Sequence, residues 1–182
     1  IIYVMKYAMI LSVLAAPVFA DCSVGTDYSD EIAQIVGDMQ AAPDPGSAQV
    51  LSGEMWEIWL DAPDELAQAM LDDGLALLRV GDYVSSYTAL SALIDYCPDY
   101  PEGYNQRAFG AFLSGSYDAA LADLEAAIAL QPVHLGALTG KALTLIAMDR
   151  RDEAQDVLRA ALAINPWLSE RALLDEPDGT DI

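Results

Sequence analysis

The stretch PEGYNQRAFGAFLSGSYDAALADLEAAIALQPVH, residues 101–134, contains two helical patterns joined by a short turn. In its first half, Tyr104, Ala108 and Phe112 recur every four residues, so they lie on one face of a helix. Gly115 stands at the turn, where a left-handed backbone costs glycine little. Apolar residues then resume at helical spacing up to residue 130. The stretch therefore predicts two antiparallel helices.

The same pattern recurs along the chain. Pro98, Pro132 and Pro166 are 34 residues apart, and each follows a helical pattern that proline cannot continue. This period is typical of helix-turn-helix units stacked into a solenoid. We therefore expect an all-α fold, a right-handed α-solenoid of antiparallel helix pairs with short capping helices. The predicted repeats are residues 67–100, 101–134 and 135–168.

Small residues occupy corresponding places in the three repeats, where two helices must approach closely. They are Gly74, Ala108 and Ala142, followed in the second repeat by Ala120 and Ala127. With the terminal proline, this pattern resembles the tetratricopeptide repeat family. The sequence departs from the family pattern at several places. The family's early tryptophan is Met70, Tyr104 or Leu138 here, Ser86 replaces an alanine, and Asp149 stands where the other repeats have Gly81 and Gly115.

The resemblance implies a concave groove, lined by the first helix of each repeat, that holds a partner peptide or helix. The residues expected to face it are Gln68, Leu71, Leu75, Leu78, Glu102, Asn105, Phe109, Phe112, Gly136, Thr139, Leu143 and Ile146. The amide of Asn105 can bond a peptide backbone. The basic pairs and asparagines with which some family members clamp a terminal carboxylate are not reproduced, so we expect an apolar peptide or helix as ligand.

The first twenty residues have the features of a secretory signal. Lys6 follows Met5, an apolar run extends from Tyr7, and Val18-Phe19-Ala20 ends in a small residue. The alternative is an uncleaved membrane anchor. From Tyr7 to Ala20 the run has 14 residues, short of the ~20 that a spanning helix needs. We therefore expect cleavage after Ala20, a secreted or periplasmic protein, and no stable membrane anchor.

Two cysteines, Cys22 and Cys97, remain in the mature chain. In an oxidising compartment an even count favours one disulfide bond, which would tie the N-terminus to the end of the first repeat. The alternative is a buried thiol at Cys97 and a free thiol at Cys22. Both interpretations stay open from the sequence.

Residues 21–66 are expected to form a linker and a degenerate helical pair. The first helix would begin at Ser29, and the second would end before Pro63. We expect this pair to cap the N-terminal side of the array, with Trp59 packed into the first repeat and Trp56 in the same interface or exposed at its edge. Residues 169–182 are expected to end a capping helix and continue as an acidic disordered tail.

The charge and the residue inventory exclude several classes of function. With 8 Lys and Arg against 29 Asp and Glu, the formal charge of −21 repels nucleic acid. The single histidine, His134, follows a repeat boundary and is expected in a solvated loop. One histidine and two cysteines make a zinc site hard to assemble. No catalytic site, metal or cofactor is therefore predicted, and the chain is expected to be a protein-binding scaffold. A structural homo-oligomer and a non-catalytic subunit of an envelope enzyme remain alternatives.

Overall fold

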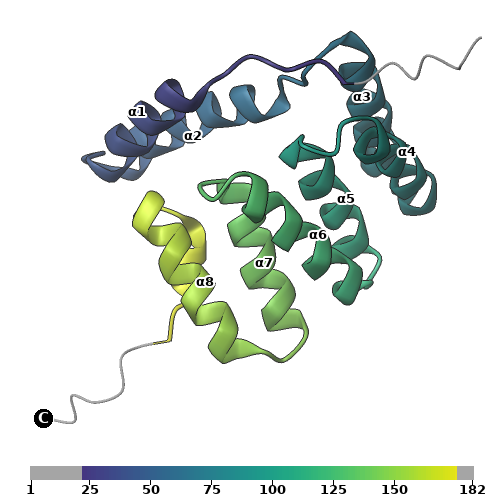
Figure 1. The fold of residues 1–182 in the computed structure, drawn as a ribbon. Helices are drawn as coiled ribbons and strands as arrows, with labels where there is room; N and C mark the ends of the chain where they lie inside the picture. The colour runs from purple at the N-terminus through teal and green to yellow at the C-terminus, as the bar shows by residue number, and fades with distance from the viewer. Residues whose placement is uncertain (1–21, 176–182) are drawn as a thin grey trace, which may run out of the picture.

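The computed structural model describes residues 22–175, which contain eight α-helices, one short 3₁₀ helix and no strand (Figure 1). Each helix from α3 to α8 packs against the next along the chain. The predicted all-α solenoid of helix pairs is therefore confirmed. The three pairs are α3 Glu65–Arg79 with α4 Tyr83–Tyr96, α5 Pro101–Leu113 with α6 Tyr117–Leu130, and α7 Leu135–Ala147 with α8 Arg151–Ile164.

The turn inside each pair has the same backbone. Gly81 and Gly115 have φ values of 78° and 79°, in the left-handed region that glycine enters easily. Asp149 occupies the third turn with a φ of 60°. In the second pair the amide of Ser116 donates to the Ala111 carbonyl at 2.8 Å, the bond that closes a Schellman turn. Gly115 therefore has the conformation that its position predicts.

Small residues let the helices approach one another. A Cβ atom on Gly74 would lie 2.5 Å from Cδ2 of Leu90, so α3 and α4 could not pack as they do with a larger residue there. Ala108, Ala120 and Ala127 are each at most 1% exposed in the interface between α5 and α6. The close approach expected at these positions is therefore present.

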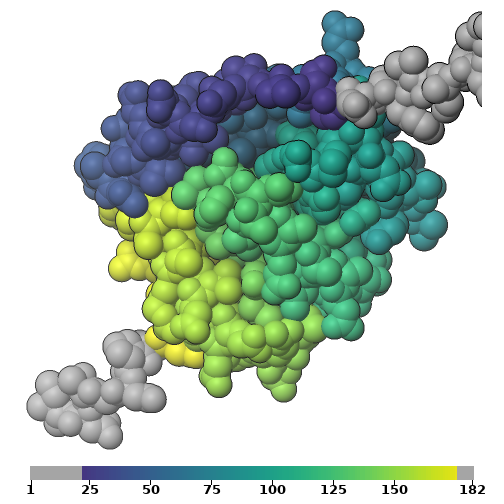
Figure 2. Space-filling view, in the orientation of Figure 1, coloured from purple at the N-terminus to yellow at the C-terminus, as the bar shows by residue number. Residues whose placement is uncertain are grey.

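The N-terminal pair does not continue the stack beyond α3. It consists of α1 Ser29–Gln40 and α2 Pro45–Leu60, which lie across one edge of the array (Figure 1). There α1 packs against α8, and α2 packs against α5. In the space-filling view the N-terminal pair covers the edge from the first repeat to the C-terminal helices (Figure 2). The prediction of a fourth unit capping the N-terminal side was therefore wrong.

The residues buried at this edge explain why the N-terminal pair does not cap the first repeat. Trp59 does not pack into the first repeat alone, because its ring lies flat on His134 at a centroid distance of 4.1 Å. The surrounding cluster joins α1 and α2 to the third repeat along this edge of the array. Its buried members are Ile32, Ile35, Met39, Met55, Trp59, Leu135, Leu138, Ala161 and Ile164.

The segment before α1 is tied to the first repeat. The structure contains a disulfide bond between Cys22 and Cys97, which closes a separation of 75 residues. Next to it, the amide of Ser23 donates to Oδ2 of Asp64 at 3.0 Å. At the other end of the pair, Gln40 donates to the carbonyl of Ala163 at 2.9 Å. The N-terminal pair is thus anchored at both ends of the three-repeat array.

The C-terminal helix is shorter than expected. It is the 3₁₀ helix η1, Ser169–Leu173, and Gln155 holds it by bonding the carbonyl of Leu173 and the amide of Asp175. Before it, Trp167 is 37% exposed and donates to the carbonyl of Ala42. The predicted signal, residues 1–20, and residues 176–182 of the predicted tail lie outside the described residues. Between residues 22 and 175 no helix is long and apolar enough to cross a bilayer.

Candidate functional site

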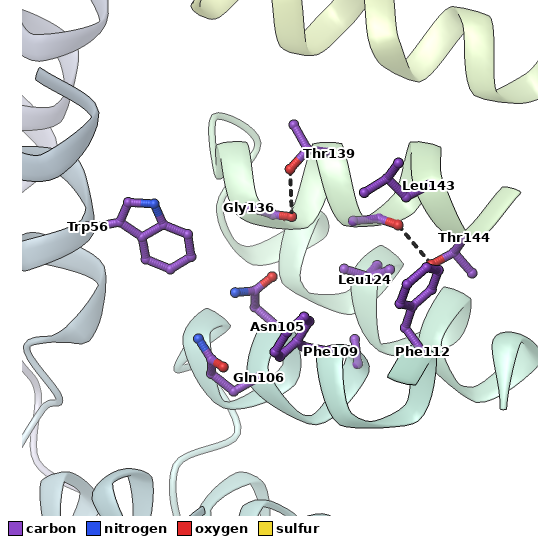
Figure 3. Close-up of a pocket in the computed structure, with 12 residues that line it drawn as sticks. Trp56, Asn105, Gln106, Phe109, Phe112, Leu124, Gly136, Thr139, Leu143 and Thr144 are labelled. Atoms are coloured by element: carbon purple, nitrogen blue, oxygen red, sulfur yellow. Dashed lines mark hydrogen bonds between the residues drawn. The ribbon is translucent and has the colours of Figure 1, made fainter. Parts of the chain in front are cut away.

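A groove with a volume of about 320 Å³ opens between α5 and α7 (Figure 3). Phe109 and Phe112 of α5 form one apolar wall, and Leu143 of α7 stands opposite. Phe109 is 51% exposed, which leaves about half of its side chain accessible to a ligand. The lining residues are Trp56, Asn105, Gln106, Ala108, Phe109, Phe112, Leu124, Gly136, Thr139, Gly140, Leu143 and Thr144.

Two glycines on α7 shape this groove. A Cβ atom on Gly136 would lie 2.9 Å from the indole of Trp56, so glycine lets α2 approach α7. A Cβ atom on Gly140 would lie 3.0 Å from Cδ2 of Leu124, which forms part of the lining from α6. The absence of a side chain at these two positions lets Trp56 and Leu124 reach the backbone of α7 beside the groove.

Trp56 closes one end of the groove. It projects from α2 toward Gly136 (Figure 3) and packs edge-on against Trp59 at a centroid distance of 5.4 Å. The N-terminal pair thus supplies one wall of a groove that is otherwise built by the second and third repeats. No periodic signal links Trp56 to those repeats, since the contact joins residues about 80 positions apart.

A buried polar cluster lies beside the same end. Glu102 and His134 are both fully buried, and Nε2 of His134 lies 2.8 Å from Oε2 of Glu102. The backbone amide of Ala137 donates to Nδ1 of His134, which makes this ring the N-cap of α7. Asn105 and Gln106 donate their amide N–H groups to Glu102.

This cluster corrects two predictions. His134 is not a solvated loop residue, because α2 crosses the repeat boundary and covers the ring with Trp59. Glu102 does not face the groove, because its carboxylate points inward to His134 and the two amides. A buried carboxylate needs such hydrogen bonds to offset its lost hydration.

Five of the residues that were expected to bind a partner line the groove in the structure. The glycine that was expected beside them lines it as well. They are Asn105, Phe109, Phe112, Thr139 and Leu143, with Gly136 between α7 and Trp56. The sequence did not point to Gln106, Gly140 or Thr144 as lining residues. It assigned Ala108 to close helix packing and placed Leu124 only within the apolar pattern of the second helix, although both also reach the groove.

The predicted groove residues of the first repeat lie elsewhere. Leu71 and Leu78 are buried with Leu75 packed against them, and Leu78 fills the space over Gly110, where a Cβ atom would lie 2.9 Å away. Gln68 accepts a bond from the Ala62 amide and donates to Asp72. In the third repeat, Ile146 packs against the core instead. None of these positions lines the groove between α5 and α7, because a common register does not tell which neighbours cover a position.

Arg107 forms an ion pair within the fold. Its guanidinium binds both oxygens of Asp123, at 2.8 and 2.7 Å, and stacks over Tyr87. The bonds to Asp123 raise the pKa of Arg107 further above its usual range. Between residues 22 and 175, no group of three His, Cys, Asp or Glu side chains is placed to hold a metal ion.

Comparisons with known proteins agree with this architecture. Residues 111–174 match the family model described as tetratricopeptide repeat. A TPR repeat-containing protein of Rhizobium etli is 26% identical over 112 residues, which are 62% of this chain and 55% of the relative. The chain thus spans about half the length of this curated relative. These findings support the tetratricopeptide repeat family.

Solved tetratricopeptide structures share the fold. The TPR2B domain of yeast Sti1, in complex with pHsp70, is 26% identical and gives a TM-score of 0.55 over 59% of this chain and 89% of its own. The first TPR of Spaghetti, bound to the HSP90 peptide SRMEEVD, is 21% identical with a TM-score of 0.57. That comparison covers 58% of this chain and 84% of the other. The tetratricopeptide family match begins in α5 and includes all of α7, so it covers one wall of the groove.

Proposed function

We propose that this protein is a non-catalytic scaffold of the periplasm or cell envelope that binds a peptide or helix of a partner protein in the groove between α5 and α7. The observation that carries the proposal is the exposed Phe109 in a preformed apolar groove. Aromatic side chains placed in such a groove anchor ligands by burying large apolar areas. Two structures of similar fold hold partners, pHsp70 in one and the peptide SRMEEVD in the other.

The envelope location rests on two further features. Residues 5–20 have the composition of a secretory signal. The disulfide between Cys22 and Cys97 fits an oxidising compartment. Fractionation of the native host and N-terminal sequencing of the mature protein test this part, and we expect a chain that begins at Asp21 in the soluble envelope fraction. A chain recovered whole from the cytosol would contradict it.

The binding surface is tested with a matched pair of variants on α5. Phe109→Ala removes the aromatic wall, whereas Leu113→Ala removes an apolar side chain of similar exposure, 43%, that does not line the groove. Crosslinked capture from the envelope fraction should lose its partner with Phe109→Ala and keep it with Leu113→Ala. Circular dichroism and thermal unfolding verify that both variants are folded. A partner that is retained by both variants would exclude the groove as the binding surface.

A homo-oligomer is a second candidate, favoured by exposed apolar side chains where α3 joins α4. Val80 and Val84 are 78% and 80% exposed at this end of the pair. Neighbouring apolar side chains with this exposure can form an interface between two copies of the chain. Light scattering coupled to gel filtration distinguishes the cases, because a dimer built on this end should dissociate with Val84→Asp.

A further inference from the structure

The buried carboxylate of Glu102 fixes the orientation of two groove amides. It accepts bonds from Asn105 Nδ2 at 3.2 Å to each oxygen, and from Gln106 Nε2. A carboxylate only accepts, so the amide nitrogens must face it. Each side-chain oxygen is then left for another partner. Both residues line the groove, and within residues 22–175 neither oxygen receives a hydrogen bond.

The hydroxyl groups of the two groove threonines already donate their hydrogens within the fold. Thr139 donates to the carbonyl of Leu135 at 2.9 Å, and Thr144 donates to the carbonyl of Gly140 at 2.8 Å (Figure 3 draws the bonds to Gly136 and Gly140). A hydroxyl has one hydrogen, so Thr139 offers a ligand only its oxygen, whereas Thr144 is fully buried and offers none. The groove therefore presents three side-chain oxygens as acceptors between its apolar walls, those of Asn105, Gln106 and Thr139.

The same cluster places negative charge beside these oxygens. Nδ1 of His134 accepts the Ala137 amide, so the single ring proton lies on Nε2 and the imidazole is neutral. It donates to Glu102 without cancelling its charge. The cations that form ion pairs in the described part of the chain bind other carboxylates: Arg107, Lys141, Arg150, Arg151 and Arg159. A carboxylate in a protein interior acts over a longer range than one in water.

We infer that the groove selects a peptide segment in which a Lys or Arg side chain accompanies an apolar anchor. The apolar side chain packs between Phe109 and Leu143, and the cation donates to the oxygens of Asn105 and Gln106 in the field of Glu102. The formal charge of −21 favours the approach of the same kind of partner. This inference rests on the proposed function, and it names the chemistry of the ligand.

The first test selects ligands from a displayed library of random twelve-residue peptides on the mature protein. Peptides that also bind Phe109→Ala are removed, so that only groove ligands remain. We expect Lys or Arg within a few positions of Leu, Phe or Met. Groove-dependent peptides that are acidic or uncharged would overturn the inference and leave the proposed function standing. If no selected peptide depends on Phe109, the proposed function itself fails.

The second test compares one selected peptide with its Lys→Gln or Arg→Gln counterpart by calorimetry. We expect the counterpart to bind wild type about tenfold more weakly, the effect of a charge-assisted hydrogen bond. In Glu102→Gln the new amide nitrogen can donate to Asn105 and Gln106, which then turn their own N–H groups to the groove. The two peptides should bind this variant equally. An undiminished preference for the cationic peptide would overturn the role of Glu102.

A third variant guards against misfolding of Glu102→Gln. Gln106→Leu leaves Glu102 in place and removes one acceptor at the partly buried edge of the groove. It should reduce the preference for the cationic peptide several-fold, whereas Leu113→Ala, outside the groove, should not change it. Equal preferences in wild type and Gln106→Leu would contradict the proposed contact.

Discussion

The three repeats are held together by contacts between helices that are neighbours in the sequence, whereas the N-terminal helix pair is held by contacts between distant parts of the chain. Each repeat packs on the next along the chain, and its turns and close contacts recur every 34 residues. The N-terminal pair instead joins α1 to α8 and α2 to α5, and a disulfide ties Cys22 to Cys97. The repeats build the long walls of the groove, and the pair supplies its end through Trp56. The difference suggests that the array determines the architecture while the pair determines the shape of the site.

The largest expected effect is on the buried tryptophan that joins the two regions. Trp59 is 4% exposed, stacks on His134 and belongs to the cluster shared with α1, α7 and α8. Trp59→Ala should lower the free energy of unfolding by about 3–5 kcal/mol, as for other aromatic truncations in a core. Urea unfolding measures this change. Trp167→Ala, at a tryptophan that is 37% exposed, is the control and should cost markedly less; equal losses would contradict the core role of Trp59.

The disulfide should have the next largest effect. Its reduction should lower the free energy of unfolding by about 2–4 kcal/mol, because the closed loop spans 75 residues. We expect α1 and α2 to loosen before the repeats, with protease cleavage appearing first between residues 22 and 65. Cys22→Ser should behave like the reduced protein and should not respond to dithiothreitol. Cleavage that appears first within the repeats would contradict a separate role for the pair.

Close packing inside the repeats gives a third, intermediate effect. A Cβ atom on Gly74 would meet Leu90 at 2.5 Å, so Gly74→Ala should destabilise the protein by about 1–3 kcal/mol. Gly53→Ala in α2 is the matched control, because no atom lies within 4 Å of its Cβ position. There the better helix propensity of alanine should raise stability by up to about 1 kcal/mol. A gain of stability in both variants would show that helix propensity alone governs both sites.

The periodic part of this molecule could be predicted from the sequence, and the reasons are local. Gly115 marks a left-handed turn, Pro132 follows the end of a helix, and Ala120 allows close packing, whatever lies elsewhere in the chain. In the site, Phe109 and Leu143 followed from the same register. Each of these inferences needs only a residue and its neighbours within one or two repeats.

The features that could not be predicted from the sequence depend on which distant element covers a given position. His134 follows a repeat boundary that would be solvated if α2 did not cross it with Trp59. Glu102 is buried because His134 and two amides satisfy its carboxylate, an arrangement that joins α5 to the N-cap of α7. Leu71 and Leu78 share the register of groove residues, yet they pack in the core of the first repeat. Apolar periodicity identifies a buried face but does not identify its partner.

Acid should weaken the link between the N-terminal segment and the first repeat. Hydrogen bonds from the amides of Ser23 and Ala67 lower the pKa of Asp64 to about 2, from its ordinary value of 3.8. Because the folded pKa is the lower one, the stability from Asp64 is present above about pH 4 and is lost as the pH falls toward 2. Asp64→Asn should therefore show a shallower loss of stability over this interval. Urea midpoints at pH 6, 4, 3 and 2 measure it, and parallel curves for the two proteins would contradict it.

The smallest effect should appear at the third turn, where the repeats differ from one another. Asp149 has a φ of 60°, in the same left-handed region as Gly81 and Gly115, and a Cβ atom is strained there. Asp149→Gly removes this strain but makes the unfolded chain more flexible, so we expect a net gain of only about 0.5 kcal/mol. Gly115→Ala places a Cβ atom in the same conformation and should cost about 1 kcal/mol. Thermal unfolding of both variants measures the two changes. If Asp149→Gly were destabilising, the aspartate would be making a favourable local interaction, and the three turns would not be equivalent.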